Sequence, residues 1–390
     1  AKSGQWWDTE PQRALANNSV GYKGKPEMGT FMREWVSLYE SKSGERGIFN
    51  REAAKVQAAK NGRRDVEHSF GCNPCSEIIL RPYQFCNLSE VVARASDTQQ
   101  TLREKVRLAT ILGTFQSTLT DFKYLRNVWK KNTEEERLLG VSLTGIMDND
   151  LLSGTSAHLG KNIGQTLETL RDTAVETNAD IAEQLGIPQS TAITCVKPSG
   201  TVSQLVDSAS GIHARHNPHY IRTVRGDNKD PLTQFMMSAG VPAEPDVMKP
   251  ESTTVFSFPM ASPRGAVTRT ILSAVEQLEL WLTYQRHWCE HKPSVTINVK
   301  EHEWLEVAAW VYKHFDEVSG ISFLPFDNHT YKQAPYQDCT EDEYIAMVTK
   351  MPKSIDWTWL QDYEKEDTTS GGRELACTAD ACEIVDLNAA

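Results

Sequence analysis

Residues 71–88 contain the side chains that are best placed for chemistry. Cys75 lies two residues after Asn73 and two residues before Glu77. A thiol can carry a reactive sulfur, a carboxylate can accept a proton, and an amide can hold a substrate hydroxyl. Pro74 stiffens the backbone because proline fixes its own φ angle and lacks an N–H donor. The spacing predicts a stiff loop that presents one thiol between an amide and a carboxylate.

Cys72 and Cys75 also form a Cys-x-x-Cys pair, which allows a second interpretation. Such a pair is typical of a structural zinc site when another pair, or two histidines, follows at matching spacing. Cys86 stands alone, and Cys377 and Cys382 lie far along the chain. A zinc-stabilised binding module is therefore the weaker hypothesis, and we expect no bound metal.

A second chemical stretch is 196–204, Val-Lys-Pro-Ser-Gly-Thr-Val-Ser-Gln, which follows a β-rich run. Hydroxyls and unpaired backbone N–H groups at a helix start can bind phosphate with the help of the helix dipole. Glycine lets a phosphate approach the backbone closely. The alternative is an ordinary Ser/Thr helix cap. The candidate phosphate-binding residues are Ser199, Gly200, Thr201, Val202 and Ser203.

Two cysteines near the end of the sequence form the third stretch. Cys377 and Cys382 lie five positions apart, behind a segment, 367–372, whose Gly-Gly pair predicts a flexible hinge. A mobile dithiol can exchange with a buried disulfide and then be reduced by an external reductant. The alternative is a pair of free thiols in a frayed tail.

Three histidines, His213, His216 and His219, are spaced three apart around Pro218. A metal site is conceivable at such a cluster, since imidazole is a common metal ligand. No cysteine or acidic cluster accompanies them, so we expect surface or hydrogen-bonded histidines and assign them no role.

The sequence Asn-Pro-Cys-Ser-Glu-Ile at 73–78, followed by Phe-Cys-Asn-Leu at 85–88, resembles the finger loop and following strand of the ribonucleotide reductase large chain. The similarity is greatest to the class II, adenosylcobalamin-dependent branch. Segments 43–52 and 137–146 resemble the same family. The resemblance covers nearly all 390 residues but matches only the second half of the enzyme.

This resemblance implies roles for individual residues. Cys75 would become a thiyl radical that abstracts the 3′ hydrogen of a ribonucleotide, while Glu77 takes the 3′ hydroxyl proton and Asn73 holds the ribose hydroxyls. Cys86 would supply reducing equivalents by forming a disulfide with a second cysteine as the 2′ hydroxyl leaves as water. The resemblance also implies that residues 199–203 bind the substrate phosphates and that the C-terminal cysteine pair reduces the active site again.

The resemblance further implies a cofactor and partners. Class I reductases carry two adjacent tyrosines on the last barrel strand, whereas this strand reads Phe323-Leu324 and the chain has no adjacent tyrosine pair. Adenosylcobalamin is then the expected radical source, bound base-on because no Asp-x-His-x-x-Gly motif occurs. The second cysteine belongs to the first half of the barrel, so we expect an N-terminal half-barrel chain as a partner. A thioredoxin- or glutaredoxin-type protein is the expected reductant.

Composition excludes several other functions. The net charge of −11 and the lack of a basic stripe argue against direct nucleic-acid binding. No window approaches ~18 uninterrupted apolar residues, so we expect no membrane span. Eight cysteines in a chain of this length suit a reducing cytoplasm with a few redox thiols.

Alternating strand and helix patterns must position these residues, and they predict an α/β fold. We expect helices at 51–60, 160–186, 268–282 and 301–315, and strands at 137–146, 292–299 and 320–325. Residues 100–147 are also expected to be helical, with one apolar face formed by Leu102, Val106, Ala109, Leu112 and Phe115.

With the resemblance, the fold expected is the second half of a ten-stranded α/β barrel with the catalytic finger loop and a flexible C-terminal tail. Residues 1–70 are expected to be a helical and loop-rich leading segment of the catalytic domain, 71–365 the half-barrel with both functional loops, and 366–390 a flexible redox tail. An inactive reductase remnant stays open as an alternative, and both di- and triphosphates stay open as substrates.

Overall fold

The computed structural model describes residues 19–41, 47–154, 162–326 and 332–365. They fall into two compact units, Ala1–Arg215 with Gly265–Phe326, and His216–Arg264 with Asp327–Ala390. The span 71–365, for which the sequence predicts one domain, is thus divided between two units. The candidate site residues of the described part all belong to the first unit.

Strands of the first unit form one row that is mostly parallel. Its members are β1 (Ser19–Tyr22), β2 (Gly47–Asn50), β5 (Asn87–Val92), β6 (Leu139–Thr144), β10 (Val295–Val299) and β11 (Ile321–Pro325). β5 pairs with β6, and β10 pairs with β11, in parallel. The segment 194–196 joins these pairs through parallel bridges from Thr194 to Val141 and from Val196 to Pro293. The row continues through β2, antiparallel to β11, to β1, parallel to β2.

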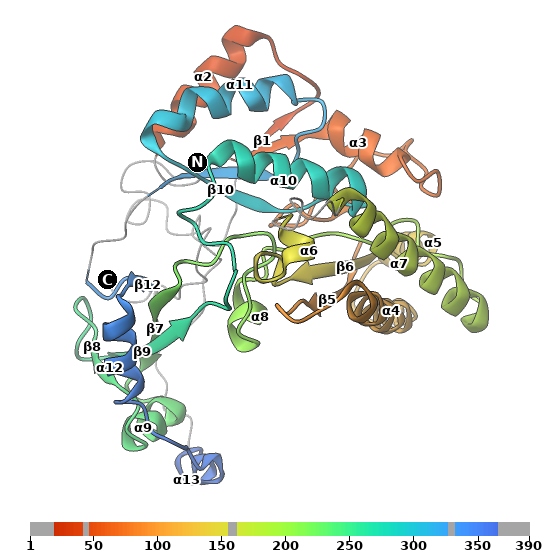
Figure 1. Cartoon of the computed structure of the whole chain (residues 1–390). Helices are drawn as coiled ribbons and strands as arrows, with labels where there is room; N and C mark the ends of the chain where they lie inside the picture. Colours follow the sequence, from red (N-terminus) through yellow and green to blue (C-terminus); the bar gives the residue numbers. More distant parts are fainter. Residues whose placement is uncertain (1–18, 42–46, 155–161, 327–331, 366–390) are drawn as a thin grey trace. The chain divides into compact units, whose positions relative to one another are not determined.

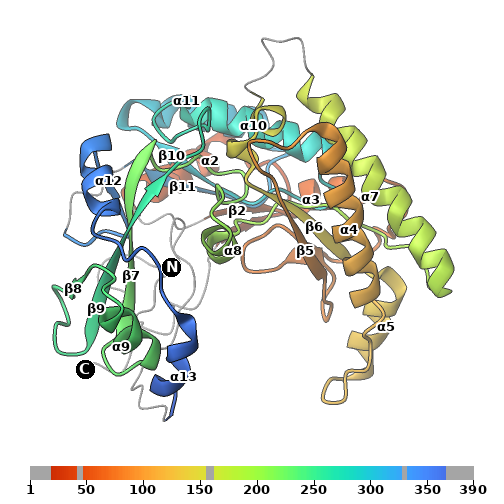
Figure 2. The same ribbon diagram turned by 60° about the horizontal axis from the view of Figure 1, so that its bottom comes forward.

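Helices alternate with these strands along the chain and pack beside them. They are α2 (Met28–Ser41), α3 (Arg51–Ala59), α4 (Gln99–Gln116), α5 (Asn127–Glu136), α6 (Asp150–Ser153), α7 (Ile163–Leu185), α8 (Gly200–Leu205), α10 (Ala274–His287) and α11 (Trp304–Lys313), with 3-10 turns at Ile146–Asp148 and Glu301–Glu303. α4 packs on β5 and β6, and α7 packs on α4 (Figure 2). α10 contacts α7, β10 and α11, and α11 contacts α2 (Figure 1). No helix within the described ranges is both long and apolar enough to cross a membrane.

The α/β alternation predicted from the sequence is confirmed, and local signals explain most boundaries. The parallel β10–α11–β11 unit is as expected. α7 ends where Gly186 adopts a left-handed φ of 65°, a conformation that glycine adopts without strain. The helix predicted at 268–282 starts later, at Ala274, because Ser273 and Glu276 form a capping box.

One helix face was predicted wrongly. Leu102, Val106 and Ala109 of α4 are buried, but Leu112 and Phe115 are 67% and 50% exposed. They lie on the far side of the helix, where residues three and four apart share a face. Together with Leu108 and Leu119 they form an exposed apolar stripe, which we call the α4 stripe.

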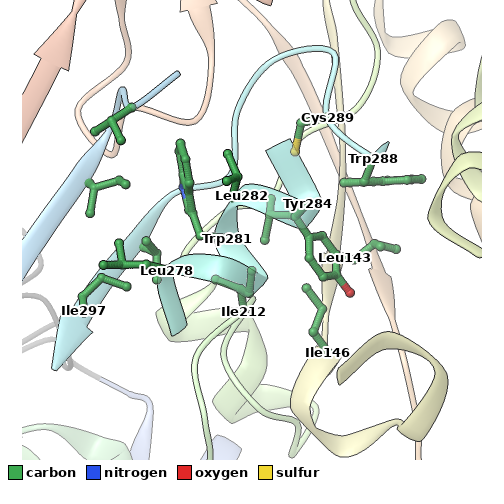
Figure 3. Packing of buried hydrophobic residues seen from close by; sticks show 14 of the residues in the cluster. Leu143, Ile146, Ile212, Leu278, Trp281, Leu282, Tyr284, Trp288, Cys289 and Ile297 are labelled. Atoms are coloured by element: carbon green, nitrogen blue, oxygen red, sulfur yellow. The ribbon is translucent and has the colours of Figure 1, made fainter. Parts of the chain in front are cut away.

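The core of the first unit centres on aromatic side chains of α10 (Figure 3). Each polar ring atom of these side chains reaches a backbone carbonyl: Trp281 donates to Pro293 over 2.8 Å, Trp288 to Cys195 over 2.7 Å, and the Tyr284 hydroxyl to Leu152 over 2.8 Å. Truncating such a buried aromatic ring typically costs about 3–5 kcal/mol. The core therefore fixes the segments 194–196 and 293–297, which flank the candidate site.

The second unit is built on an antiparallel sheet with the order β12-β7-β9-β8. Its elements are β7 (His219–Asp227), α9 (Pro231–Ser238), β8 (Ala243–Pro245), β9 (Thr253–Ala261), β12 (Tyr336–Asp338), α12 (Glu341–Val348), a 3-10 turn (Trp357–Trp359) and α13 (Leu360–Tyr363). His216 lies 2.7 Å from Asp338, and the ring centroid of His219 lies 4.9 Å from that of Tyr344. These two histidines are thus engaged within the unit.

Candidate active site

The finger-loop residues lie on a short hairpin. β3 (Gly71–Cys72) pairs antiparallel with β4 (Ile79–Leu80), and residues 73–78 connect them. Asn73 closes this loop twice: its carbonyl accepts from Ser76 N over 2.9 Å, and its Oδ1 accepts from Ile78 N over 3.0 Å. Its side-chain NH2 group donates to none of the described residues. That group is available to a ligand at the loop.

Cys75 occupies the tip of this hairpin and is half-buried. Burial raises the pKa of the Cys75 thiol to about 11, the charge of Glu77 adds to the effect, and the charge of Lys197 opposes it. A thiol with this pKa stays protonated near neutral pH, so it is a poor nucleophile. It retains the S–H hydrogen that a radical can abstract.

Glu77 is 1% exposed and points away from solvent. Its carbonyl accepts from Lys292 N over 3.0 Å, which joins the loop to the segment ahead of β10. Its Oε2 atom is buried and has no hydrogen-bond partner among the described residues. A buried, unpaired carboxylate oxygen is costly unless a ligand supplies a donor.

His291 joins the hairpin to strand β6. Its Nδ1 accepts from Ile79 N over 3.3 Å, and its Nε2 donates to Leu139 O over 2.9 Å. Burial holds the pKa of His291 well below its ordinary value. The neutral ring therefore ties β4 to the start of β6.

Lys292 is a fully buried cation beneath the loop, and sequence analysis missed it. Its Nζ donates to Ser319 Oγ over 3.2 Å and lies 4.5 Å from the centre of the Phe49 ring. Burial lowers the pKa of Lys292 to about 8, against the opposing influence of Cys72 and Glu77. In the sequence it precedes an ordinary strand pattern, which gives no sign of a buried charge.

Cys86 lies at the start of β5, beside Gly140 of β6. A Cβ atom at Gly140 would lie 3.2 Å from Cys86 Sγ and 2.4 Å from Leu88 Cδ2. Burial, reinforced by the Glu77 charge, raises the pKa of Cys86. Cys72, Cys75 and Cys86 are all free thiols, and Cys72 Sγ lies 3.3 Å from Ser76 Oγ. The absence of a side chain at Gly140 thus leaves room for the Cys86 thiol.

A buried ion-pair network holds the chain between the hairpin and Cys86. Arg64 and Glu136 pair at 2.8 Å with both side chains essentially inaccessible, and Arg81 lies 3.1 Å from the same carboxylate. Gln84 Oε1 accepts from Arg81 N over 2.8 Å. Removing one partner of such a buried network typically costs about 3–5 kcal/mol, because the other charge is left uncompensated.

The predicted phosphate-binding residues begin the short helix α8. Ser199 Oγ donates to Glu90 Oε2 over 2.7 Å, and Ser203 Oγ lies 2.7 Å from Ser210 Oγ. Both of these serines are buried, whereas Gly200, Thr201 and Val202 are exposed. The two serine hydroxyls are therefore engaged internally, and residues 200–202 are the exposed part of the turn.

Lys197 and Glu90, which sequence analysis also missed, connect this turn electrostatically to the hairpin. The charge of Lys197 lowers the pKa of Cys75, Cys86 and Glu90, although burial raises each of them more. Glu77 raises the pKa of the same three groups. The hairpin thiols and the 197–200 turn thus share one electrostatic environment.

The remaining predicted residues do not join this site. His213 Nε2 accepts from Thr296 N over 3.0 Å, which confirms a hydrogen-bonded histidine. No group of three or more His, Cys, Asp or Glu side chains in the described part of the chain is arranged to hold a metal ion. Cys377 and Cys382 lie outside the described residues.

Comparisons with known proteins identify relatives. No family model matches the chain. Proteins described as adenosylcobalamin-dependent ribonucleoside-triphosphate reductases are similar: that of Euglena gracilis is 27% identical over 83% of this chain and 43% of its own length. Those of Lactobacillus gasseri and Lacticaseibacillus paracasei are 26% and 29% identical, over 95% and 90% of this chain and 53% and 50% of their own lengths. The chain therefore spans about half the length of these curated relatives.

Solved structures agree on the fold. The crystal structure of a B-12 dependent, class II ribonucleotide reductase matches with a TM-score of 0.72 over 93% of this chain and 54% of that chain, at 20% identity. The class Id ribonucleotide reductase alpha subunit of Actinobacillus ureae matches with a TM-score of 0.52 over 84% of this chain and 65% of that chain, at 15% identity. The class II resemblance indicated by the finger-loop motif is confirmed.

Proposed function

We propose that this chain forms the thiol-bearing part of an adenosylcobalamin-dependent ribonucleotide reductase, which converts ribonucleotides to 2′-deoxyribonucleotides. The observation that carries the proposal is the hairpin on which Cys75, a protonated thiol, lies two residues from the buried Glu77 carboxylate with its unpartnered oxygen. The relatives' description as triphosphate reductases makes ribonucleoside triphosphates the proposed substrates.

The residues present fit the cofactor's chemistry. Adenosylcobalamin, when bound, supplies the radical chemistry that protein side chains lack. On this chain, Cys75 holds the S–H hydrogen that such chemistry requires, because its raised pKa keeps the thiol protonated. The sequence has no Asp-x-His-x-x-Gly motif, and we therefore propose base-on binding.

The neighbouring side chains manage the substrate's protons and electrons. The Asn73 amide, whose Oδ1 is committed to Ile78 N, donates from its NH2 group to a ribose hydroxyl. Glu77 Oε2 accepts the 3′ hydroxyl proton. Replacing the 2′ hydroxyl with hydrogen, which releases water, requires two electrons and two protons, and Cys86 and a thiol outside this chain's described part supply them as they form a disulfide. The exposed backbone of 200–202 is proposed to bind the substrate phosphates.

We propose that the strand row belongs to a ten-stranded α/β barrel that another segment completes. Six strands and the 194–196 segment fill consecutive positions, and β5 and β1 end the row with unpaired edges among the described strands. Unpaired edges and exposed apolar patches mark association surfaces. The α4 stripe is a further exposed apolar surface of this unit. An N-terminal half-barrel chain is the proposed partner. It would also supply the second thiol.

The C-terminal cysteines complete the proposed redox cycle. Cys377 and Cys382 would reduce the disulfide formed at Cys86 and would in turn be reduced by a thioredoxin- or glutaredoxin-type protein. The six described cysteines are free thiols, which supports a reducing compartment such as the cytoplasm.

Replacing Cys75 with serine tests the proposal directly. In enzyme complemented with an N-terminal half and adenosylcobalamin, Cys75→Ser should abolish conversion of radiolabelled ribonucleoside triphosphate to the deoxy product. Cys72→Ser is the matched control, since it alters a thiol on the same hairpin, and it should retain turnover. Wild-type rates from Cys75→Ser would overturn the assignment, and robust turnover by the isolated chain would overturn the need for a partner.

A further inference from the structure

Glu90 connects two strands to the turn that precedes α8. It lies on β5 in register with Ser142 on β6. Ser142 Oγ accepts a hydrogen bond from Lys197 N over 2.9 Å. Glu90 Oε2 also accepts from Ser199 Oγ over 2.7 Å. Ser142 thus holds the Lys197 end of the 197–199 segment, and Glu90 holds the Ser199 end.

The turn at 197–199 requires a stabilising side-chain bond because of the backbone conformation of Ser199. Ser199 has φ 56° and ψ 37°, in the left-handed region that residues with a Cβ atom rarely adopt. Its hydroxyl makes no capping bond to α8, although serine is a preferred N-cap residue. The hydroxyl is instead committed to Glu90. The Ser199 hydroxyl therefore forms a hydrogen bond to Glu90 in place of an ordinary helix cap, and this bond stabilises the left-handed conformation of Ser199.

The opposite side of the turn is closed by backbone. A Cβ atom at Gly211 would lie 2.2 Å from Lys197 O, and Gly211 N donates to Thr144 Oγ1 over 2.9 Å. The turn is therefore clamped between this close backbone contact and the Glu90 side chain. The backbone contact fixes the Lys197 end, and the Glu90 bond holds the Ser199 side chain, while the Ser199 carbonyl accepts from Ser203 N over 3.1 Å.

We propose that Glu90 is a positioning residue that holds Ser199 in its left-handed conformation and so sets the backbone orientation of residues 200–202. The importance of this role for substrate binding rests on the proposed function, which assigns the substrate phosphates to that backbone. Glu90 acts through Ser199 and transfers no proton or electron.

Hydrogen–deuterium exchange of the chain tests the structural role without any assay of activity. Glu90→Ala should accelerate exchange in peptides covering 196–205 by about tenfold, the effect expected from losing a hydrogen bond to an ionised group. Glu90→Gln keeps an acceptor oxygen and should stay within about threefold of wild type. Ser89→Ala is the matched control, because Ser89 Oγ is buried on the same strand with no hydrogen-bond partner among the described residues.

Two double variants exclude general loosening as the explanation. Adding Ser199→Ala to Glu90→Ala should give no further acceleration, because both changes remove the same bond. Adding Ser199→Gly should slow exchange relative to that double alanine variant, because glycine adopts the left-handed conformation without strain. Unchanged exchange in Glu90→Ala, or additive effects of the alanine pair, would overturn the proposal.

Kinetics of the complemented enzyme then test the consequence. Glu90→Ala should raise KM for a ribonucleoside triphosphate about tenfold while kcat stays within about threefold, since a positioning loss affects binding more than the chemical step. An equal fall in kcat with unchanged KM would contradict a role in phosphate positioning. If complemented wild-type enzyme reduces no ribonucleotide, the proposed function fails, and the exchange experiment still decides the role of Glu90.

Discussion

Replacing Glu77 with glutamine should lower the pKa of Cys75. The Cys75 pKa rises from an ordinary 9.0 to about 11, mainly through burial and secondarily through the Glu77 charge. Because burial is the larger cause, removing the Glu77 charge should lower the Cys75 pKa by less than burial raises it, on the order of 1 pH unit. Glutamine keeps the shape of the side chain, so burial of the thiol stays the same.

The expected effect is large enough to measure by alkylation. At pH 9, a thiol with a pKa of about 11 is roughly 1% thiolate, whereas one with a pKa of 9.0 is roughly 50% thiolate. Wild-type Cys75 should therefore react with iodoacetamide about fiftyfold more slowly than an unperturbed cysteine at this pH, and Glu77→Gln should accelerate it by up to about tenfold. Mass spectrometry of the peptide that contains Cys75, followed from pH 7 to pH 12, measures this directly.

The midpoint of the rate–pH profile separates electrostatics from loosening of the loop. Loosening raises the alkylation rate at every pH, whereas loss of the Glu77 charge moves the midpoint to lower pH. Lys197→Met should move the midpoint the other way, because the Lys197 charge favours the thiolate. Glu90→Gln is the matched control, since Glu90 is not among the charges that act on Cys75. An unmoved midpoint in Glu77→Gln, or a lower midpoint in Lys197→Met, would refute the reasoning.

Three further changes have defined outcomes. Lys292→Met should remove a pH dependence of the free energy of unfolding. The folded-state pKa of Lys292, about 8, lies below the ordinary 10.5, so the unfolded chain binds more protons between these pH values and wild-type stability should rise with pH by up to about 3 kcal/mol. The difference between wild-type and variant urea unfolding across this window measures the effect. Gly140→Ala should lower the free energy of unfolding by about 1–3 kcal/mol, because the new methyl group overlaps Leu88; an unchanged urea midpoint would contradict this packing. Cys377→Ser combined with Cys382→Ser should block turnover driven by thioredoxin in the complemented enzyme but leave roughly one turnover from pre-reduced protein, with a small dithiol restoring activity; unchanged multi-turnover rates with thioredoxin would show that the tail is idle.

The conformation of the finger loop, residues 73–78, could be predicted from the sequence because neighbouring residues determine it. The bonds that shape the finger loop join Asn73 to Ser76 and Ile78, all within six consecutive residues. Proline and asparagine at these positions restrict the backbone whatever the rest of the chain does. The placement of Cys75 near Glu77 therefore follows from spacing alone.

Glu90, Lys197 and Lys292 were not predictable in the same way. Ser199 and Glu90 are 109 positions apart, and Lys292 reaches the finger loop only because its segment lies beside 194–196 in the strand row. Single-sequence patterns carry no register between distant strands, so they cannot show which charges are buried together. The internal partners of the Ser199 and Ser203 hydroxyls, Glu90 and Ser210, could not be seen for the same reason.

Periodicity also failed to identify the buried face of α4. Leu112 and Phe115 are apolar at helical spacing, as buried residues usually are, yet they lie opposite the face that packs on β5 and β6. A helix with apolar residues on two sides does not reveal which one meets its own sheet. The second unit was missed although its central strands, β7 and β9, are nine residues long, because a single sequence does not show their antiparallel pairing.

The neutral imidazole beneath the hairpin has a consequence for the proton chemistry above it. His291 receives a bond at one ring nitrogen and gives one at the other, so its tautomer is fixed by the two strands it joins. It can gain a proton only by giving up its bond to Ile79. The anchor of the loop thus keeps its charge whatever protonation change the proposed reaction brings to Glu77. The β3–β4 hairpin is therefore held in register by His291, a group whose charge stays constant.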